Sequence, residues 1–210
     1  EINYLDGVTS NIQTQLNSAG GASNVTGLSD ALVDGDESMY IGNDPSSTTS
    51  TAIKNVALGV KALDAITTGD HNTALGFEAL SSNTTGYRNS ASGTFALFRN
   101  ITGYENTDTG YDALTENTTG ANNTAFGYRA LRFNTTGNYN TALGKNAGNL
   151  ITTGSNNVII GYDSDPSAND ASNQIVIGKG ATGLGDNYAV IGNTDVTRVY
   201  AAQDAGATLY

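Results

Sequence analysis

The sequence predicts an all-β fold, a parallel β-roll or β-solenoid of 17-residue coils, and two observations lead to it. An unbroken repeat runs from Asn55 to Asn156, and each 17-residue unit opens with Asn and carries Gly at fixed places, as at Gly59 and Gly69. A fixed short period is typical of solenoids, in which each unit packs on its neighbours. Seventeen residues are also too few for a strand plus a helix, but they suit one flattened β coil.

The composition agrees with a thin, extended structure rather than an ordinary globular core. The chain has 210 residues, of which 38% are hydrophobic and 14% charged, with 26 Gly and no Trp. So low an apolar fraction also occurs in disordered chains. A repeat that keeps Gly in register over successive units argues for ordered coils stabilised by ladders between neighbours.

Each unit is expected to contain two short strands and a return turn. The first strand covers the opening five residues, as in 72–76, with Thr73 and Leu75 on one face and Ala74 on the other. The second strand is expected over 78–81. Thr-Thr-Gly at 84–86 then makes the return turn, where Gly permits a positive φ.

Residues 17 apart form rows along the stack, and small rows are expected to fill the interior. The alanine rows begin at Ala57 and Ala62, and Asp108 replaces Ala in the first of them. Two larger rows begin at Leu58 and Leu63. Since the alanines leave a thin interior, at least one large row should face outward as an apolar stripe, which marks an association surface. Identical rods would meet best around an axis parallel to their length, as a closed cyclic oligomer.

The Asn row that starts at Asn55 is expected to be structural, because stacked amides hydrogen-bond along a ladder. The same is expected of the Thr row that starts at Thr68. After Asn157 the period is expected to degrade, with the next strand motif 16 residues later at Asn173 and another 14 residues on at Asn187.

Four regions follow from these patterns. Residues 1–18 fit a short coiled-coil helix, and a lone helix packed on its own domain is the alternative. Residues 19–37 read as a linker or cap, 38–192 as the β-roll repeat domain with its regular part at 55–156, and 193–210 as an exit segment.

Charge and cysteine content exclude several classes of partner. The net charge is −11, yet the repeats 55–156 hold seven acidic and six basic residues. No basic patch exists, so nucleic acid and anionic membranes are not expected to bind. There is no Cys, no apolar run of the ~20 residues that a spanning helix needs, and no signal peptide. A chain that begins with Glu1 is expected to be a fragment or a processed product.

The unit N-T-A-[LF]-G-x-x-A-L…N-T-T-G, seen at 72–86 and 123–137, resembles the YadA-like head repeats of trimeric autotransporter adhesins. It is similar in closer detail to bacteriophage tail fibres with such arrays, in which a cleaved chaperone domain often follows. The resemblance covers 38–192 and, more weakly, 5–16. It implies a left-handed parallel β-roll in an intertwined or side-by-side homotrimer. Ser92, Asp108 and Thr109 depart from the pattern.

The sequence contains no clear catalytic motif, and no catalytic residue is assigned. His71 is the sole histidine and is expected to be an exposed turn residue. Paired carboxylates, as in glycan hydrolases, are the alternative to weigh. The acids that cluster in one repeat are Glu105, Asp108, Asp112 and Glu116. Asp112 is expected in a variable, solvated row.

Metal and cofactor sites are not expected either. Asp108 could face a polar gap, bind an ion on the oligomer axis, or be tolerated between Thr107 and Thr109. The acids of 163–170 resemble a calcium loop in composition only, because the Gly and terminal Glu of an EF-hand are missing. Thr arrays also occur on ice-binding solenoids, but the Thr-Thr pairs here precede a turn Gly instead of lying in mid-strand.

The sequence therefore predicts a non-enzymatic, structural and adhesive trimeric fibre. The expected setting is a phage tail fibre in the virion, joined to other tail proteins and facing a glycan or protein receptor on the host cell. The alternatives are the head of a bacterial trimeric adhesin at the cell surface and a glycan-cleaving tailspike. No single ligand-binding residue is assigned, although exposed tyrosines are candidates: Tyr87, Tyr104, Tyr111, Tyr128 and Tyr139.

Overall fold

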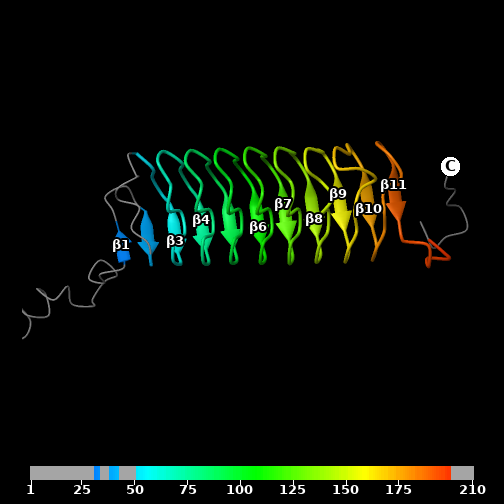
Figure 1. The fold of residues 1–210 in the computed structure, drawn as a ribbon, viewed down its shortest axis with the longest axis horizontal. Coiled ribbons are helices and arrows are strands. Elements are labelled where there is room, and N and C mark those ends of the chain that lie inside the picture. Colours follow the sequence, from blue (N-terminus) through cyan, green and yellow to red (C-terminus); the bar gives the residue numbers. More distant parts are fainter. Residues whose placement is uncertain (1–30, 34–37, 43–50, 200–210) are drawn as a thin grey trace, which may run out of the picture.

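A computed structural model describes residues 31–33, 38–42 and 51–199, and these form one rod of stacked coils (Figure 1). Eleven short strands join one sheet in chain order. They are β1 (Ala31–Val33), β2 (Met39–Ile41), β3 (Val56–Leu58), β4 (Thr73–Leu75), β5 (Ser90–Ser92), β6 (Thr107–Thr109), β7 (Thr124–Phe126), β8 (Thr141–Leu143), β9 (Val158–Ile160), β10 (Ile175–Ile177) and β11 (Ala189–Ile191).

The predicted parallel β-solenoid is confirmed. Strands β2 to β11 pair in parallel, and one coil advances the register by 17 residues, as in Val56 opposite Thr73. At the N-terminal end of the sheet, β1 pairs with β2 in the antiparallel sense. The described residues contain no helix. The predicted coiled coil of 1–18 and most of the linker lie outside the described residues, as do 200–210 of the exit segment.

The 17-residue period persists further than predicted. Ile175 pairs with Val158, and the backbone N–H of Gln174 donates to Asn157 Oδ1 at 3.0 Å, so Gln174 occupies the Asn place of its coil. The predicted 16-residue step to Asn173 was wrong. Asn173 is not the equivalent of Asn157; the next residue, Gln174, is. The final step to β11 is indeed 14 residues, with Ile175 opposite Ala189.

The first strand of each coil has the predicted faces. In β4, Ala74 is buried while Thr73 and Leu75 are exposed. The second strand, predicted over 78–81, was wrong, because these residues form turns in which Glu78 and Leu80 have φ of 55° and 53°. Alternating left-handed residues still direct N–H groups along the rod, and Leu80 N donates to the Ala96 carbonyl at 3.0 Å.

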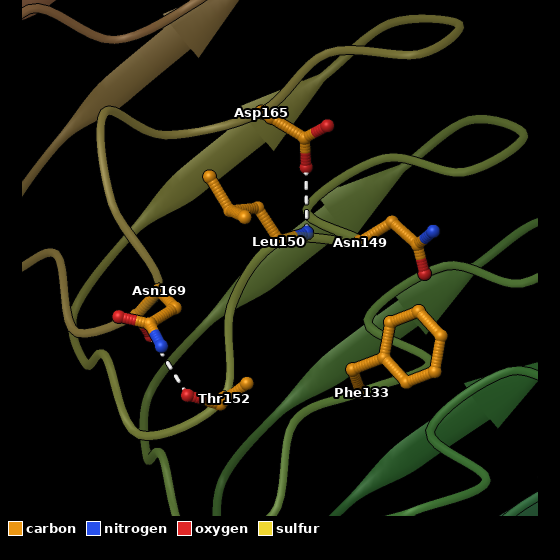
Figure 2. A pocket seen from close by; sticks show the side chains of 6 residues that line it. All are labelled: Phe133, Asn149, Leu150, Thr152, Asp165 and Asn169. Atoms are coloured by element: carbon orange, nitrogen blue, oxygen red, sulfur yellow. Dashed lines mark hydrogen bonds between the residues drawn. The ribbon is translucent and has the colours of Figure 1, made fainter.

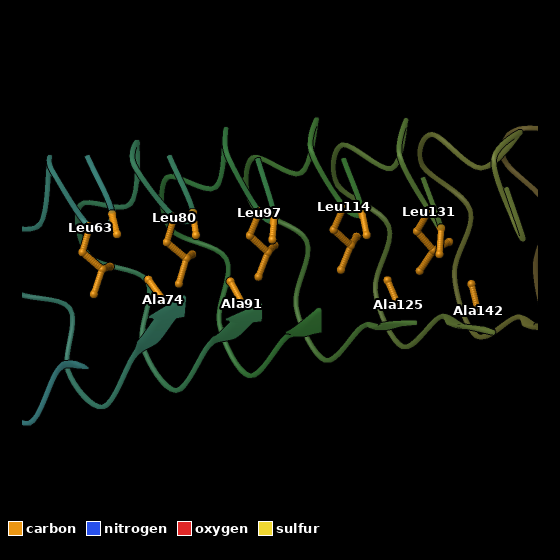
Figure 3. Packing of buried hydrophobic residues seen from close by; sticks show 14 of the residues in the cluster. Leu63, Ala74, Leu80, Ala91, Leu97, Leu114, Ala125, Leu131 and Ala142 are labelled. Atoms are coloured by element: carbon orange, nitrogen blue, oxygen red, sulfur yellow. The ribbon is translucent and has the colours of Figure 1, made fainter. Parts of the chain in front are cut away.

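The core consists of the two alanine rows and one leucine row, which face each other inside each coil (Figure 3). The buried leucines are Leu63, Leu80, Leu97, Leu114 and Leu131. The row that starts at Leu58 therefore faces outward, which decides between the two large rows. Because one side of the interior is lined by alanine, each chain encloses a narrow core.

The predicted asparagine ladder is confirmed and explains the invariant first residue of each unit. Asn72 Oδ1 accepts the Asn89 N–H at 3.0 Å and its amide at 3.1 Å, while Asn72 Nδ2 donates to the Gly86 carbonyl at 2.9 Å. Each buried amide thus ties three segments of backbone together. A second buried ladder, which the sequence reading missed, contains Asn83, Asn100, Asn117 and Asn134.

Two expectations about the return turn need correction. Thr68 and its equivalents are exposed, and the hydroxyl bonds come from the preceding Thr, as in Thr67 Oγ1 to the Thr84 carbonyl at 2.9 Å. Gly86 does not have a positive φ; Arg88, two residues later, does, at 54°. Glycine is needed at Gly86 because a Cβ would collide with the backbone carbonyl of Gly103 in the next coil and with Asn83 Oδ1 of the second ladder.

Candidate functional site

The most continuous candidate site is the outer face of the sheet, which carries a row of large apolar side chains. We call this the outer apolar row, and its exposed members are Leu58, Leu75, Phe126, Leu143 and Ile191. Leu75 and Leu143 each keep 46% of their surface exposed. Since identical strands stack in register, these side chains form one line along the rod.

The outer apolar row is interrupted at two strands and bordered by small polar residues. Ser92 and Thr109, which depart from the repeat, take the place of Leu in β5 and β6. The bordering row comes two residues earlier in each strand and contains Thr73, Ser90, Thr107, Thr124 and Thr141. The face is therefore apolar at both ends of the rod and polar at its middle.

The candidate tyrosines stack on one another rather than standing as separate contacts. Tyr87 and Tyr104 are parallel with ring centroids 4.9 Å apart, and Tyr111 and Tyr128 are 5.5 Å apart. Tyr139 is exposed and has a positive φ of 58°. Stacking covers one face of each ring, and Arg88 and Arg129 lie over the rings of Tyr87 and Tyr128, so the pairs are partly used in packing between coils.

The acidic cluster does not converge into a catalytic pair. Glu105 lies 2.8 Å from Arg88, and Glu116 lies 3.0 Å from Arg99. Each of these partners lies one coil away along the rod. Such pairs connect neighbouring coils, and each exposed pair is worth less than about 1 kcal/mol.

Asp112 and Asp108 differ from the solvated environment expected of surface acids. Asp112 is buried, and its Oδ2 lies 3.4 Å from Arg129 and 3.6 Å from Arg132, so the expectation of a solvated position was wrong. Asp108 points into the core between Ala91 and Ala125, and burial raises the pKa of its carboxyl well above the ordinary value. It faces the interior of its own chain, so it cannot hold an ion on an axis outside the coil.

The single histidine and the acidic loop show no metal geometry. His71 is exposed with φ of 58°, in the same row as Arg88 and Glu105, which also have positive φ. Within the described residues, no three His, Cys, Asp or Glu side chains are placed to share a metal ion. Asp163 and Asp170 are exposed, while Asp165 accepts the Leu150 N–H at 2.8 Å.

A notch on the turn side of the rod is the second candidate site, and sequence reasoning missed it (Figure 2). Its volume is about 390 Å³. It is lined by Phe133, Asn149, Leu150, Thr152, Asp165 and Asn169. These residues come from three consecutive coils, so no single repeat contains the site. The one signal in the sequence is the loss of the A-L pair after Ala147, where Gly148 and then Asp165 replace the leucine.

Comparisons with protein-family models, curated proteins and solved structures gave no match to this chain. The fold itself places the protein in the class of parallel β-solenoids. Over the part of the chain that the structure describes, no helix has the length and apolar character needed to cross a bilayer.

Proposed function

We propose that this chain forms the shaft of a homotrimeric, adhesive fibre, and that the fibre belongs to a bacteriophage tail. The observation that carries the proposal is the outer apolar row, which stays exposed along the sheet of a single chain. A soluble rod that exposes a regular line of Leu and Phe side chains is expected to cover that line with protein.

The energetic reason lies in the narrow core. One chain buries alanine where a globular domain would bury larger side chains. Leu75 and Leu143 are already about half buried, so burying the rest of each such side chain contributes about 1 kcal/mol, roughly half of the value for full burial. Association along the rod therefore supplies apolar burial that the single coil lacks.

The arrangement of the row favours a closed assembly with its axis along the rod. The strands stack in one register, so most of them present an apolar side chain at the same place, and contacts between two chains would repeat from coil to coil except at Ser92 and Thr109. The number three comes from the resemblance of the N-T-A-L-G…N-T-T-G unit to trimeric head repeats. Three copies of any weak surface site then gain avidity on a cell surface.

The head of a trimeric adhesin on a bacterial surface has the same repeat and is the second candidate. The sequence that flanks this chain separates the two settings. A membrane-anchor barrel downstream indicates an adhesin, whereas a virion-attachment or chaperone region indicates a tail fibre.

Charged substitutions in the outer apolar row test the proposal. Leu75→Glu combined with Leu143→Glu is expected to give folded monomers by light scattering, because both side chains are exposed in the single chain. Ser82→Arg is the matched control, since the next unit carries Arg99 at the same place. The control should keep the oligomeric mass. An unchanged mass in the glutamate variant would contradict the proposed interface.

The adhesive part of the proposal is tested on cells. The fluorescently labelled trimer is expected to bind some members of a panel of bacterial strains, and the glutamate variant should bind them about 10²-fold or more weakly through lost avidity. Absence of binding to every strain, or equal binding by the dissociated variant, would count against an adhesive fibre.

A further inference from the structure

The notch lies where the turn side of the solenoid changes its sequence. Phe133 comes from one coil, Asn149, Leu150 and Thr152 from the next, and Asp165 and Asn169 from the third. In the preceding coils, the row that contains Asp165 carries buried leucines, and the last of them is Leu131. Gly148 and Asp165 follow Leu131 in that row. Gly148 faces the core, where an added Cβ would lie 2.9 Å from Leu131 Cδ2, whereas the half-buried Asp165 lines the notch.

The floor of the notch combines an aromatic ring with an aliphatic side chain. Phe133 and Leu150 remain 41% and 44% exposed. The Arg132 guanidinium carbon lies 5.0 Å from the Phe133 ring centroid, and Arg132 is itself 3.6 Å from Asp112. One face of the ring is thus supported by a cation that is already paired, which leaves the opposite face for a ligand.

The polar residues around this floor are Asn149, Thr152, Asp165 and Asn169, and they include acceptors with free capacity. Asp165 uses Oδ1 to accept the Leu150 N–H at 2.8 Å, and Figure 2 shows its second oxygen directed away from that bond. Asn149 Oδ1 is buried without a hydrogen-bond partner. The Thr152 hydroxyl donates to the Asn169 carbonyl at 3.4 Å and closes one side. An acceptor-rich rim beside an apolar floor requires a ligand with several hydroxyl donors and an apolar face.

We propose that the notch is a binding site for a neutral saccharide of one or two sugar units. The C–H face of a pyranose would lie on Phe133, and its hydroxyls would donate to Asp165 and Asn149. The volume of about 390 Å³ falls in the lower part of the range of small-ligand sites, about 300–1,000 Å³. This inference rests on the proposed fibre function, because it names the receptor chemistry for that fibre.

The negative charge at the notch favours neutral sugars over acidic sugars. Asp165 lines the notch, Asp163 lies two residues away, and no Lys or Arg is among the lining residues. The chain carries a net charge of −11. A uronic or sialic acid carboxylate would therefore meet like charge without a partner, which disfavours binding.

Saturation-transfer NMR on the full chain tests the site with the methyl glycosides of glucose, galactose, mannose and N-acetylglucosamine as probes. At least one of them is expected to give a signal, and methyl glucuronide is expected to give none. Phe133→Ala should reduce affinity about tenfold or more, and it should fold because Ala65 occupies the same place four coils earlier. Asp165→Asn keeps an acceptor for Leu150 and should weaken binding about 3–10-fold.

Phe77→Thr is the matched control, since it removes an exposed ring elsewhere and Thr94 occupies the same place in the next unit. It should leave the signal unchanged. No signal from any neutral probe, or a signal that persists in Phe133→Ala, would overturn the assignment of the notch. Cell binding that survives Phe133→Ala would likewise reject the notch while leaving the fibre intact. If the unmodified trimer itself bound no bacterial strain, that result would instead reject the adhesive function.

Discussion

At the scale of single residues, Asp108 is the least favourable side chain in the core. It takes an alanine place in β6, and neither of its carboxyl oxygens has a hydrogen-bond partner. The backbone N–H of Leu97 would lower the pKa of Asp108 if it bonded to the carboxyl. It donates instead to the Ala113 carbonyl, at 3.2 Å. Burial without a partner therefore favours the neutral acid in the folded chain.

Asp108→Ala is expected to stabilise the protein in a pH-dependent way. The folded pKa lies above the ordinary value of 3.8, so the unfolded chain ionises first and stability falls as pH rises from about that value through the folded pKa. At pH 7 the variant should unfold with a free energy about 1–3 kcal/mol larger than the native chain. Near pH 3 this difference should largely disappear. Denaturant unfolding of both proteins at the two pH values measures it, and a difference that does not change with pH would contradict the interpretation.

The sequence predicted the faces of single residues correctly where the residue type agreed with the alternation of side chains along a strand. The sequence predicts Ala74 on one face and Thr73 and Leu75 on the other, because side chains alternate along a strand, and the structure confirms this with Ala74 buried. The left-handed conformation of Glu78 and Leu80 could not be predicted, because neither residue type favours a positive φ. Their conformation is imposed by the neighbouring coils, whose carbonyls accept their N–H groups.

At the scale of the repeating element, the buried asparagines hold one coil to the next. Asn89 accepts from the backbone and side chain of Asn106 at 3.1 Å each, and donates to the Gly103 carbonyl at 2.9 Å. Sequence reasoning found this ladder because Asn opens every unit. It missed the ladder at Asn83, where the first unit carries Ile66 and the last Ile151.

Asn89→Ala is expected to destabilise the rod by about 1–3 kcal/mol, because it leaves the buried N–H of Asn106 without an acceptor, whereas the Gly103 carbonyl keeps its bond from Asn100 at 2.9 Å. Thr85→Ala, in the exposed row of the preceding turn, should change stability by less than about 0.5 kcal/mol. Thermal or denaturant unfolding of the two variants provides the comparison. Equal stability of both would show that the ladder contributes little.

At the scale of the whole molecule, the rod has a sheet face that carries the outer apolar row, interrupted at Ser92 and Thr109, and a turn side with varied chemistry. The outer apolar row repeats along the sheet, whereas the notch at Phe133 occurs once. The row could be predicted as one of two alternatives, and the structure selected the one that starts at Leu58. The notch could not be predicted, because it depends on how three coils with unequal turns pack together.

Function at this scale depends on the number of chains in the assembly. A single rod presents each surface site once, and a trimer presents it three times at the same height. In the fibre that we propose, the outer apolar row would serve assembly and the notch would serve attachment to the cell.

The mass of the unmodified chain in solution tests the central claim most directly. Light scattering at a concentration where circular dichroism shows the folded β structure should give three times the chain mass of 21.6 kDa. A mass of one chain under the same conditions would contradict the trimer, since the outer apolar row would then remain uncovered in a stable monomer.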